Sequence, residues 1–309
     1  MEESASPGAL GALLDGGVWF LKNLVLAFYH FGYAVTHPGL WLDWSNNEAI
    51  MRVVYFGGSV EFFFVVLAAF LVLTGLGLWR RSIMWGAVRV LEGFANTVGR
   101  FFAWAGLLMV LQQIMIVFLQ RIFRVAEIQL GPLGYGFAKD LSWWSEELKL
   151  YNAMIVCLCA TYTFVQSGHV RVDLVYAGVS FRTKRLIDMF GALFFMMPVA
   201  VLTWLYSWFF LWRHLITPKP SASESFDRLM MKARALRWNV ETIGFSPNGF
   251  NGYFLFKVLL LALTAMIFVQ AVAFFYRSFL EYVEGEDSAG KYLDRDSLGA
   301  GEEAYEGTH

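Results

Sequence analysis

The sequence predicts an all-α fold, a polytopic bundle of helices in a membrane. Only 16% of the 309 residues are charged and 58% are hydrophobic, whereas about a quarter of the residues are charged in soluble domains. The mean hydropathy is +0.52. Five apolar runs are each long enough to cross about 30 Å of hydrocarbon. Together these observations indicate a multi-pass membrane protein.

Residues 1–55 form an N-terminal extension in which we expect one amphipathic helix. Val18 to Thr36 is apolar, but its polar and aromatic side chains fall on one helical stripe: Lys22, Tyr29, His30, Tyr33 and His37. This pattern favours a helix that lies in the membrane interface. A spanning helix with its polar stripe packed on a partner is the alternative. No basic region precedes this first apolar run, so we do not expect a cleaved secretory signal.

The first strong span is predicted over Phe56 to Trp79, which ends at Arg80-Arg81. With the start of the basic amphipathic connector that follows, it makes up residues 56–88. The connector continues to Arg100. The second span follows at Phe101 to Gln120, and Arg121 and Arg124 mark its end.

A charged joint, Gln166 to Asp188, separates the third and fourth predicted spans, Leu148 to Val165 and Leu186 to Trp212. Two apolar runs around such a joint indicate a membrane hairpin. Pro198 lies inside the fourth span and is expected to kink it, because proline has no N–H to donate. Before the third span, Val125 to Glu147 predicts a loop and a short interfacial helix.

The last predicted span is Gly252 to Tyr276, which contains Lys257 and Gln270. The polar segment before it predicts an amphipathic helix over Ser225 to Arg237. Residues 278–309 are acidic and rich in glycine, and we expect a disordered tail there.

The density of Lys and Arg predicts the orientation. It is highest in the loops 80–100 and 167–185, which places these loops in the cytoplasm. Five spans then put the N-terminus outside and the C-terminal tail inside. If Val18 to Thr36 also spans, the N-terminus lies in the cytoplasm.

No side-chain pattern points to catalysis. Cys157 and Cys159 face nearly opposite sides of a helix, and no two of the five histidines share a spanning helix at positions i and i+4. There is no glycine-rich phosphate loop and no CxxC motif. We therefore expect no enzyme and no catalytic, cofactor or metal site. The net charge of −1 gives no indication of a nucleic-acid partner.

A set of motifs in a fixed order gives the chain a family resemblance. An arginine boundary, with Arg121 and Arg124, follows the second span, and the segment Trp143-Trp144-Ser145-Glu146-Glu147 leads into the third. The joint then reads His169-Val170-Arg171-Val172-Asp173, with Arg182 and Asp188 after it. Glu241 to Gly249 and a last span holding Lys257 and Gln270 complete the order. Residues 89–277 thus resemble the small permease (DctQ-like) subunit of tripartite ATP-independent periplasmic (TRAP) transporters.

The resemblance implies a four-helix core with both termini in the cytoplasm, to which residues 1–88 add one spanning helix and an amphipathic helix. It implies a small subunit of the bacterial inner membrane that scaffolds a large permease subunit. That large subunit moves its substrate, commonly an organic acid, by a sodium-driven elevator motion, and a periplasmic binding protein delivers the substrate. The motif residues named above are then candidates for partner contact, and membrane lipid surrounds the bundle.

Alternatives remain open at this stage for the joint and for the whole chain. For the joint, the residues His169, Arg171 and Asp173 fit either topogenic charge with a local salt bridge or a docking patch for a partner. For the whole chain, the main alternative is a membrane-anchor subunit of a redox enzyme that binds haem or quinone, which needs facing histidines. A stand-alone secondary transporter is the third reading.

Overall fold

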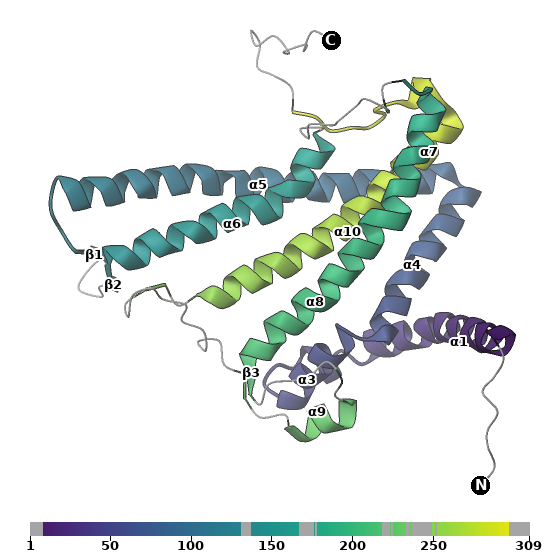
Figure 1. Cartoon of the computed structure of the whole chain (residues 1–309), viewed down its shortest axis with the longest axis horizontal. Helices are drawn as coiled ribbons and strands as arrows, with labels where there is room; N and C mark the ends of the chain where they lie inside the picture. Colours follow the sequence, from purple (N-terminus) through teal and green to yellow (C-terminus); the bar gives the residue numbers. More distant parts are fainter. Residues whose placement is uncertain are drawn as a thin grey trace. The chain divides into compact units, whose positions relative to one another are not determined.

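The described part of the chain is an all-α membrane bundle with two short antiparallel strand pairs (Figure 1). The structure is a computed structural model that describes residues 9–130, 137–166, 176, 178–217, 223, 225–232, 235–236, 249–250 and 252–296. Six of its helices or helical runs are long and apolar enough to cross a membrane. The chain divides into two compact units, residues 1–80 with 205–240 and residues 81–204 with 241–309.

The first unit begins with α1 (Ala9–Thr36), α2 (Gly39–Leu42), α3 (Asn47–Phe56) and α4 (Val60–Trp79). Asn46 and Ser59 cap α3 and α4 by accepting hydrogen bonds from backbone N–H groups, which satisfies donors that a helix start leaves without partners. The span predicted over Phe56 to Trp79 therefore starts at Val60, after the separate short helix α3.

Helix α1 packs on α4 through Ala27, Phe64 and Ala68. Sequence analysis favoured an interfacial helix over Val18 to Thr36 and kept a spanning helix as the alternative. Because α1 has 28 residues and a composition apolar enough to cross, it is a candidate span, which supports the alternative. The α1 surface that packs on α4 is apolar. The predicted polar stripe of α1 is therefore not the surface in contact with α4.

The rest of the first unit forms around the end of α8 (Met197–Leu215). Trp208 donates its indole N–H to the carbonyl of Val54 at 2.8 Å, and the ring lies where a Cβ at Gly57 would be. Strands β3 (Ile216–Thr217) and β4 (Ala235–Leu236) pair, and α9 (Phe226–Lys232) packs on α3. The predicted helix Ser225 to Arg237 is therefore too long, because residues 235–236 pair as a strand.

The second unit is built on α5 (Arg81–Arg121), α6 (Leu141–Val165) and α10 (Tyr253–Glu284), which lie side by side (Figure 1). The predicted connector and second span form one helix of 41 residues, about 60 Å long at 1.5 Å per residue. The predicted interfacial helix before the third span is likewise the first part of α6. A hairpin of β1 (Glu127–Leu130) and β2 (Phe137–Asp140) joins α5 to α6, where sequence analysis predicted only a loop.

The fourth predicted span is a continuous helical run. It comprises α7 (Phe181–Gly191), the π-helical turn η1 (Ala192–Met196) and α8. The π turn stands directly before Pro198, where the missing N–H interrupts the regular pattern. The irregularity predicted at this proline thus takes the form of a widened turn.

The prediction of a disordered tail from residue 278 is wrong up to residue 296. Helix α10 continues to Glu284, and η2 (Glu286–Ser288) follows. Residues 289–296 then return along α5. They are held by specific contacts described below, which overcome the weak hydrophobicity on which the prediction rested.

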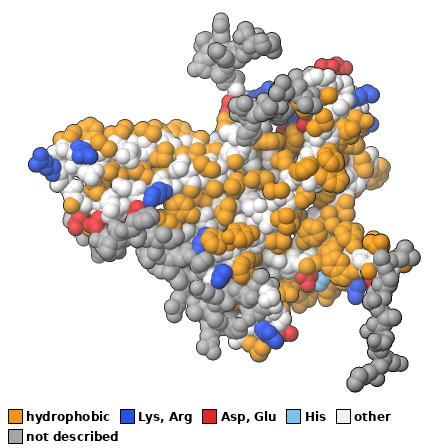
Figure 2. Space-filling model, viewed as in Figure 1, with side chains coloured by type: hydrophobic (Ala, Val, Ile, Leu, Met, Phe, Trp, Pro, Cys, Tyr) orange, Lys and Arg blue, Asp and Glu red, His pale blue; other side chains and the backbone are white. Residues whose placement is uncertain are grey.

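The outer helix faces suit a lipid environment. Many large apolar side chains are more than one third exposed, among them Leu108, Phe194, Phe195 and Leu202. Figure 2 shows hydrophobic side chains over much of the visible helix surface, with several Lys and Arg side chains near its margins.

Candidate functional site

A buried network of charged side chains joins α5, α7 and α10. Arg277 of α10 donates from Nε and Nη2 to the two carboxylate oxygens of Glu92 of α5, at 2.6 and 2.5 Å. Only 7% of Arg277 and 5% of Glu92 are exposed. A two-bond arginine–carboxylate pair sets the direction as well as the distance between its helices.

The network continues from α10 to α7 through Glu281, which is 1% exposed. Glu281 Oε1 lies 3.4 Å from Arg277 Nη1, and Oε2 lies 2.7 Å from Arg185 Nε. This second contact is an ion pair without hydrogen-bond alignment. Arg185 also donates to Asp188 at 3.1 Å, and the hydroxyl of Tyr176 donates to the same carboxylate oxygen at 2.8 Å.

Such a network acts mainly by holding helices in one arrangement. Burial of charge is costly, and a buried pair repays the cost only with good geometry and further hydrogen bonds. Each of the two arginines here contacts two carboxylates. The chemistry available at this network is therefore mutual neutralisation, with helices α5, α7 and α10 as the parts held together.

Polar contacts also join the N-terminal part of α6 to its neighbours. Gln112 of α5 donates to Glu147 at 2.5 Å and to the carbonyl of Trp144 at 3.2 Å. The amide of Gln112 thus links α5 to α6. Glu146 accepts the backbone N–H of Phe250, at 2.8 Å, just before α10.

The structure brings only some of the sequence-predicted residues together. Asp188 is in the buried network and Glu146 is at the opposite end of the unit. Arg182 is exposed on α7, and Arg121 and Arg124 are exposed at and just beyond the end of α5. Lys257 and Gln270 are both buried in α10, 13 positions apart. His169, Arg171 and Asp173 lie outside the described residues, so the docking patch of the joint stays a prediction.

Sequence reasoning missed the centre of the network, Glu92, Arg185, Arg277 and Glu281. One local signal was available, because Arg277 and Glu281 are opposite charges at i and i+4, and Arg185 and Asp188 are opposite charges at i and i+3. Both pairs stand at span ends, where charged residues also serve orientation. The partner Glu92 is 185 positions from Arg277, a distance that no local pattern bridges.

Metal ligation has no support within the described ranges. Among these residues no group of three or more His, Cys, Asp or Glu side chains is placed to hold a metal ion. The two cysteines are unpaired, and Cys159 is buried.

Comparison with known proteins gives one match. Residues 133–226 match the family model described as "Tripartite ATP-independent periplasmic transporters, DctQ component". No curated protein and no solved structure matches the chain. The matched residues take in β2, α6, the joint, α7, α8 and β3, and thus Glu146, Arg182 and Asp188, and they end at the first residue of α9. Arg121, Arg124, Lys257 and Gln270 lie outside them.

The match covers about a third of the chain, with residues 133–204 in the second unit and residues 205–226 in the first. It contains the charged joint on which the predicted resemblance mainly rested. The chain therefore resembles the DctQ component, the small permease of TRAP transporters, with helices α1 to α5 preceding the matched residues.

Proposed function

We propose that the chain is the small membrane subunit of a TRAP transporter and scaffolds the large permease subunit in a bacterial inner membrane. In this proposal the large subunit uses a sodium gradient to take up an organic acid that a periplasmic binding protein delivers. The observation that carries the proposal is the DctQ match over residues 133–226. This family is a transporter component that works with two others.

The buried network supports the scaffold part of the proposal. A subunit that anchors the static part of a transporter needs helices that keep one arrangement while its partner moves. Arg277 and Arg185 tie α5, α7 and α10 together through carboxylates that are almost fully buried. Breaking such pairs exposes an uncompensated charge to a low-dielectric interior, which makes these helices poor candidates for motion.

The proposed partner contacts lie at both membrane surfaces. On the predicted periplasmic side stand Arg121, Arg124 and the exposed Arg228 of α9. We expect these to hold the large subunit or to receive the binding protein. On the cytoplasmic side the joint supplies His169, Arg171 and Asp173, with Arg182 exposed beside them in sequence.

The experiment is a mild-detergent pull-down of the tagged full-length chain from its native membrane. Recovery of a large polytopic permease in about equal amount supports the scaffold function. Recovery of a haem or flavin protein instead, or of this chain alone, contradicts it.

Uptake measurements then separate the scaffold from the receiving surface. Arg228→Ser, with Lys232→Ser, Arg234→Ser and Arg237→Ser, is expected to lower uptake while membrane level and pull-down of the permease stay unchanged. Unchanged uptake would remove this basic segment from the proposal without touching the scaffold function. Loss of uptake when the sodium gradient is collapsed tests the driving ion.

A further inference from the structure

The segment that follows α10 folds back on α5 as a strap, residues 285–296. Its first half rests on the buried network. Gly290 donates its backbone N–H to Glu281 at 3.1 Å, and the carbonyl of Lys291 accepts from Arg277 at 3.0 Å. Tyr292 has a φ of +58°, which is uncommon for a bulky residue. Specific contacts, rather than backbone preference, therefore hold this half.

Aromatic and cationic groups supply those contacts. The ring of Tyr292 packs edge-on against Trp85, with centroids 5.6 Å apart, and Arg89 lies 5.1 Å over the Tyr292 ring. Lys291 lies 5.5 Å over Trp85 and 3.7 Å from Glu284. These contacts place the next residues of the strap, up to residue 296, beside α5 and α6.

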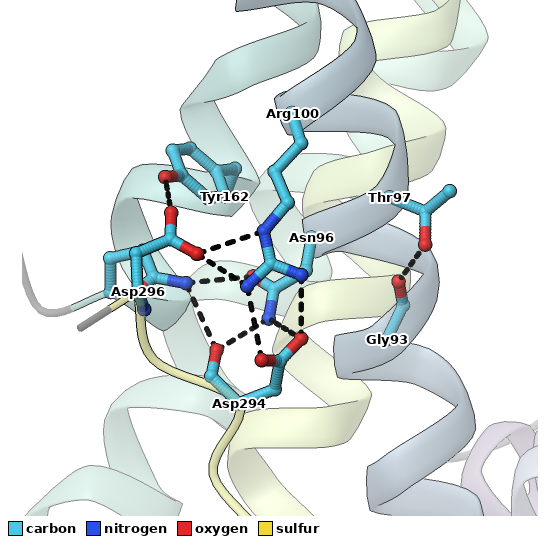
Figure 3. Close-up of polar contacts among 8 residues, drawn as sticks. Gly93, Asn96, Thr97, Arg100, Tyr162, Asp294 and Asp296 are labelled. Carbon is cyan, nitrogen blue, oxygen red and sulfur yellow. Dashed lines mark hydrogen bonds and ion pairs between the residues drawn. The ribbon is translucent and has the colours of Figure 1, made fainter.

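The second half places two aspartates on one arginine (Figure 3). Arg100 of α5 donates to both carboxylate oxygens of Asp294, at 2.8 and 3.0 Å, and to Asp296 at 3.0 and 2.5 Å. The hydroxyl of Tyr162 of α6 donates to the second oxygen of Asp296. Exposed ion pairs are weak on their own, so these contacts alone would not specify a site.

The main chain of the strap is recognised as well. The amide of Gln166 donates to the carbonyl of Asp294 at 3.0 Å and accepts the backbone N–H of Asp296 at 3.0 Å. Asn96, which is 1% exposed, donates to the same carbonyl at 2.8 Å. Gln166 also bonds to Asn96 at 3.3 Å, so the two amides are held in place by each other. The Gln166 side-chain amide thus contacts the backbone on both sides of residue 295, and Arg100 binds the two carboxylates on either side of that residue.

We propose that Asn96, Arg100, Tyr162 and Gln166 form a recognition site for an acidic Asp-x-Asp peptide segment, occupied in cis by residues 294–296. The occupant is the chain's own strap, and the ligand chemistry is two carboxylates on either side of one residue, together with a backbone carbonyl and a backbone N–H. By filling the site the strap clamps the end of α6 to the middle of α5. The inference rests on these contacts and is independent of transport.

The test uses tryptic cleavage after Arg295 in the full-length protein in detergent, followed by intact mass. The bond that trypsin cuts carries the Asp296 nitrogen that Gln166 holds, so cleavage reports release of the strap. Arg100→Gln and Gln166→Ala leave the cleaved sequence unchanged and are expected to raise the initial rate about fivefold or more. The double variant should be no faster than the faster single variant, because both open the same site.

The matched control is Thr97→Ala. Thr97 lies next to Asn96, and its hydroxyl donates to the carbonyl of Gly93 in its own helix (Figure 3), so the cleavage rate should match that of the unaltered protein. About 0.5 M KCl should speed cleavage of the unaltered protein but not of Arg100→Gln, because salt screens exposed charge pairs. The effect of the salt on trypsin itself is measured with a small chromogenic substrate, and the rates are corrected for it. Equal rates in all variants would overturn the proposal. If Arg100→Gln lowers the melting temperature, Arg100→Lys replaces it, since lysine keeps the charge but lacks the fork.

Discussion

The positively charged side chain of Arg277 is buried, and only 7% of the residue is exposed. Its two bonds to Glu92 and its contact with Glu281 neutralise that charge. At the residue scale, the loss of a single member of this group is expected to be costly, because it leaves a buried charge without its partner.

Arg277→Met is therefore expected to destabilise the protein by about 3–5 kcal/mol, since it leaves the buried carboxylate of Glu92 unpaired. The apparent melting temperature in detergent measures the loss. Adding Glu92→Leu should recover part of it, because the second change removes the stranded charge. Arg182→Met, at an exposed position of α7, is the control and should change stability by no more than about 0.5 kcal/mol. A double variant less stable than Arg277→Met would contradict the pairing.

The strap aspartates give a pH prediction of definite sign. Hydrogen bonds from Arg100 lower the pKa of Asp294 below its ordinary value of 3.8. The Tyr162 hydroxyl, then Arg100, does the same for the pKa of Asp296. A lowered pKa means that docking is fully stabilised above the ordinary value and is lost as the pH falls through the lowered one. The charged and titratable groups facing them are Arg100 of α5, Tyr162 of α6 and each other.

Docking should accordingly be equal at about pH 7 and pH 5 and weaken only below about pH 4. The mobility of a spin label on Arg295→Cys, with Cys157→Ser and Cys159→Ala, measures it. Tyr162→Phe removes one of the bonds that lower the pKa of Asp296, so its loss of docking should be complete at a higher pH. Gradual loosening between pH 7 and pH 5 would mean that another group controls the strap.

At the scale of elements, the close approach of α5 and α6 depends on Gly99. A Cβ at this position would collide with the Cβ of Tyr162, and the Cys159 thiol reaches the Gly99 carbonyl at 3.4 Å. Gly93, on the same helix, has open space around it. Both glycines lie inside α5, but only Gly99 is packed against another helix.

We expect Gly99→Ala to destabilise the protein by about 1–3 kcal/mol, because it forces two packed helices apart. Gly93→Ala should be neutral or stabilising by up to about 1 kcal/mol, because alanine favours the helix. Thermal unfolding of both variants in detergent makes the comparison. Equal effects would show that the contact at Gly99 does not limit how closely the helices approach.

The sequence predicts that a helix is present wherever hydropathy and helical periodicity agree. It does not predict where each helix begins and ends. Each of the five predicted apolar runs overlaps a candidate span over most of its length, although the first run begins four residues before its span. Hydropathy could not show that Arg81 to Arg100 continues the span as one helix, because its face is covered by α10 and the strap. Nor could it show the β1–β2 hairpin or the docked tail, both of which depend on contacts between distant segments.

At the scale of the whole molecule, the orientation turns on α1. Six crossings place both termini on the same side, and the basic loops place that side in the cytoplasm. Five crossings place the N-terminus outside. The candidate span over α1 favours six.

Single-cysteine labelling in intact cells with an impermeant maleimide decides between the two topologies, in a chain carrying Cys157→Ser and Cys159→Ala. Val125→Cys, at an exposed position in the predicted periplasmic loop, should react at once. Thr183→Cys, exposed at the start of α7, should react only after permeabilisation. Ser6→Cys is expected to behave like Thr183→Cys, because a crossing α1 puts the N-terminus inside. If Ser6→Cys reacts in intact cells, α1 does not cross, its polar stripe faces the interface as the periodicity first indicated, and α4 becomes the first span.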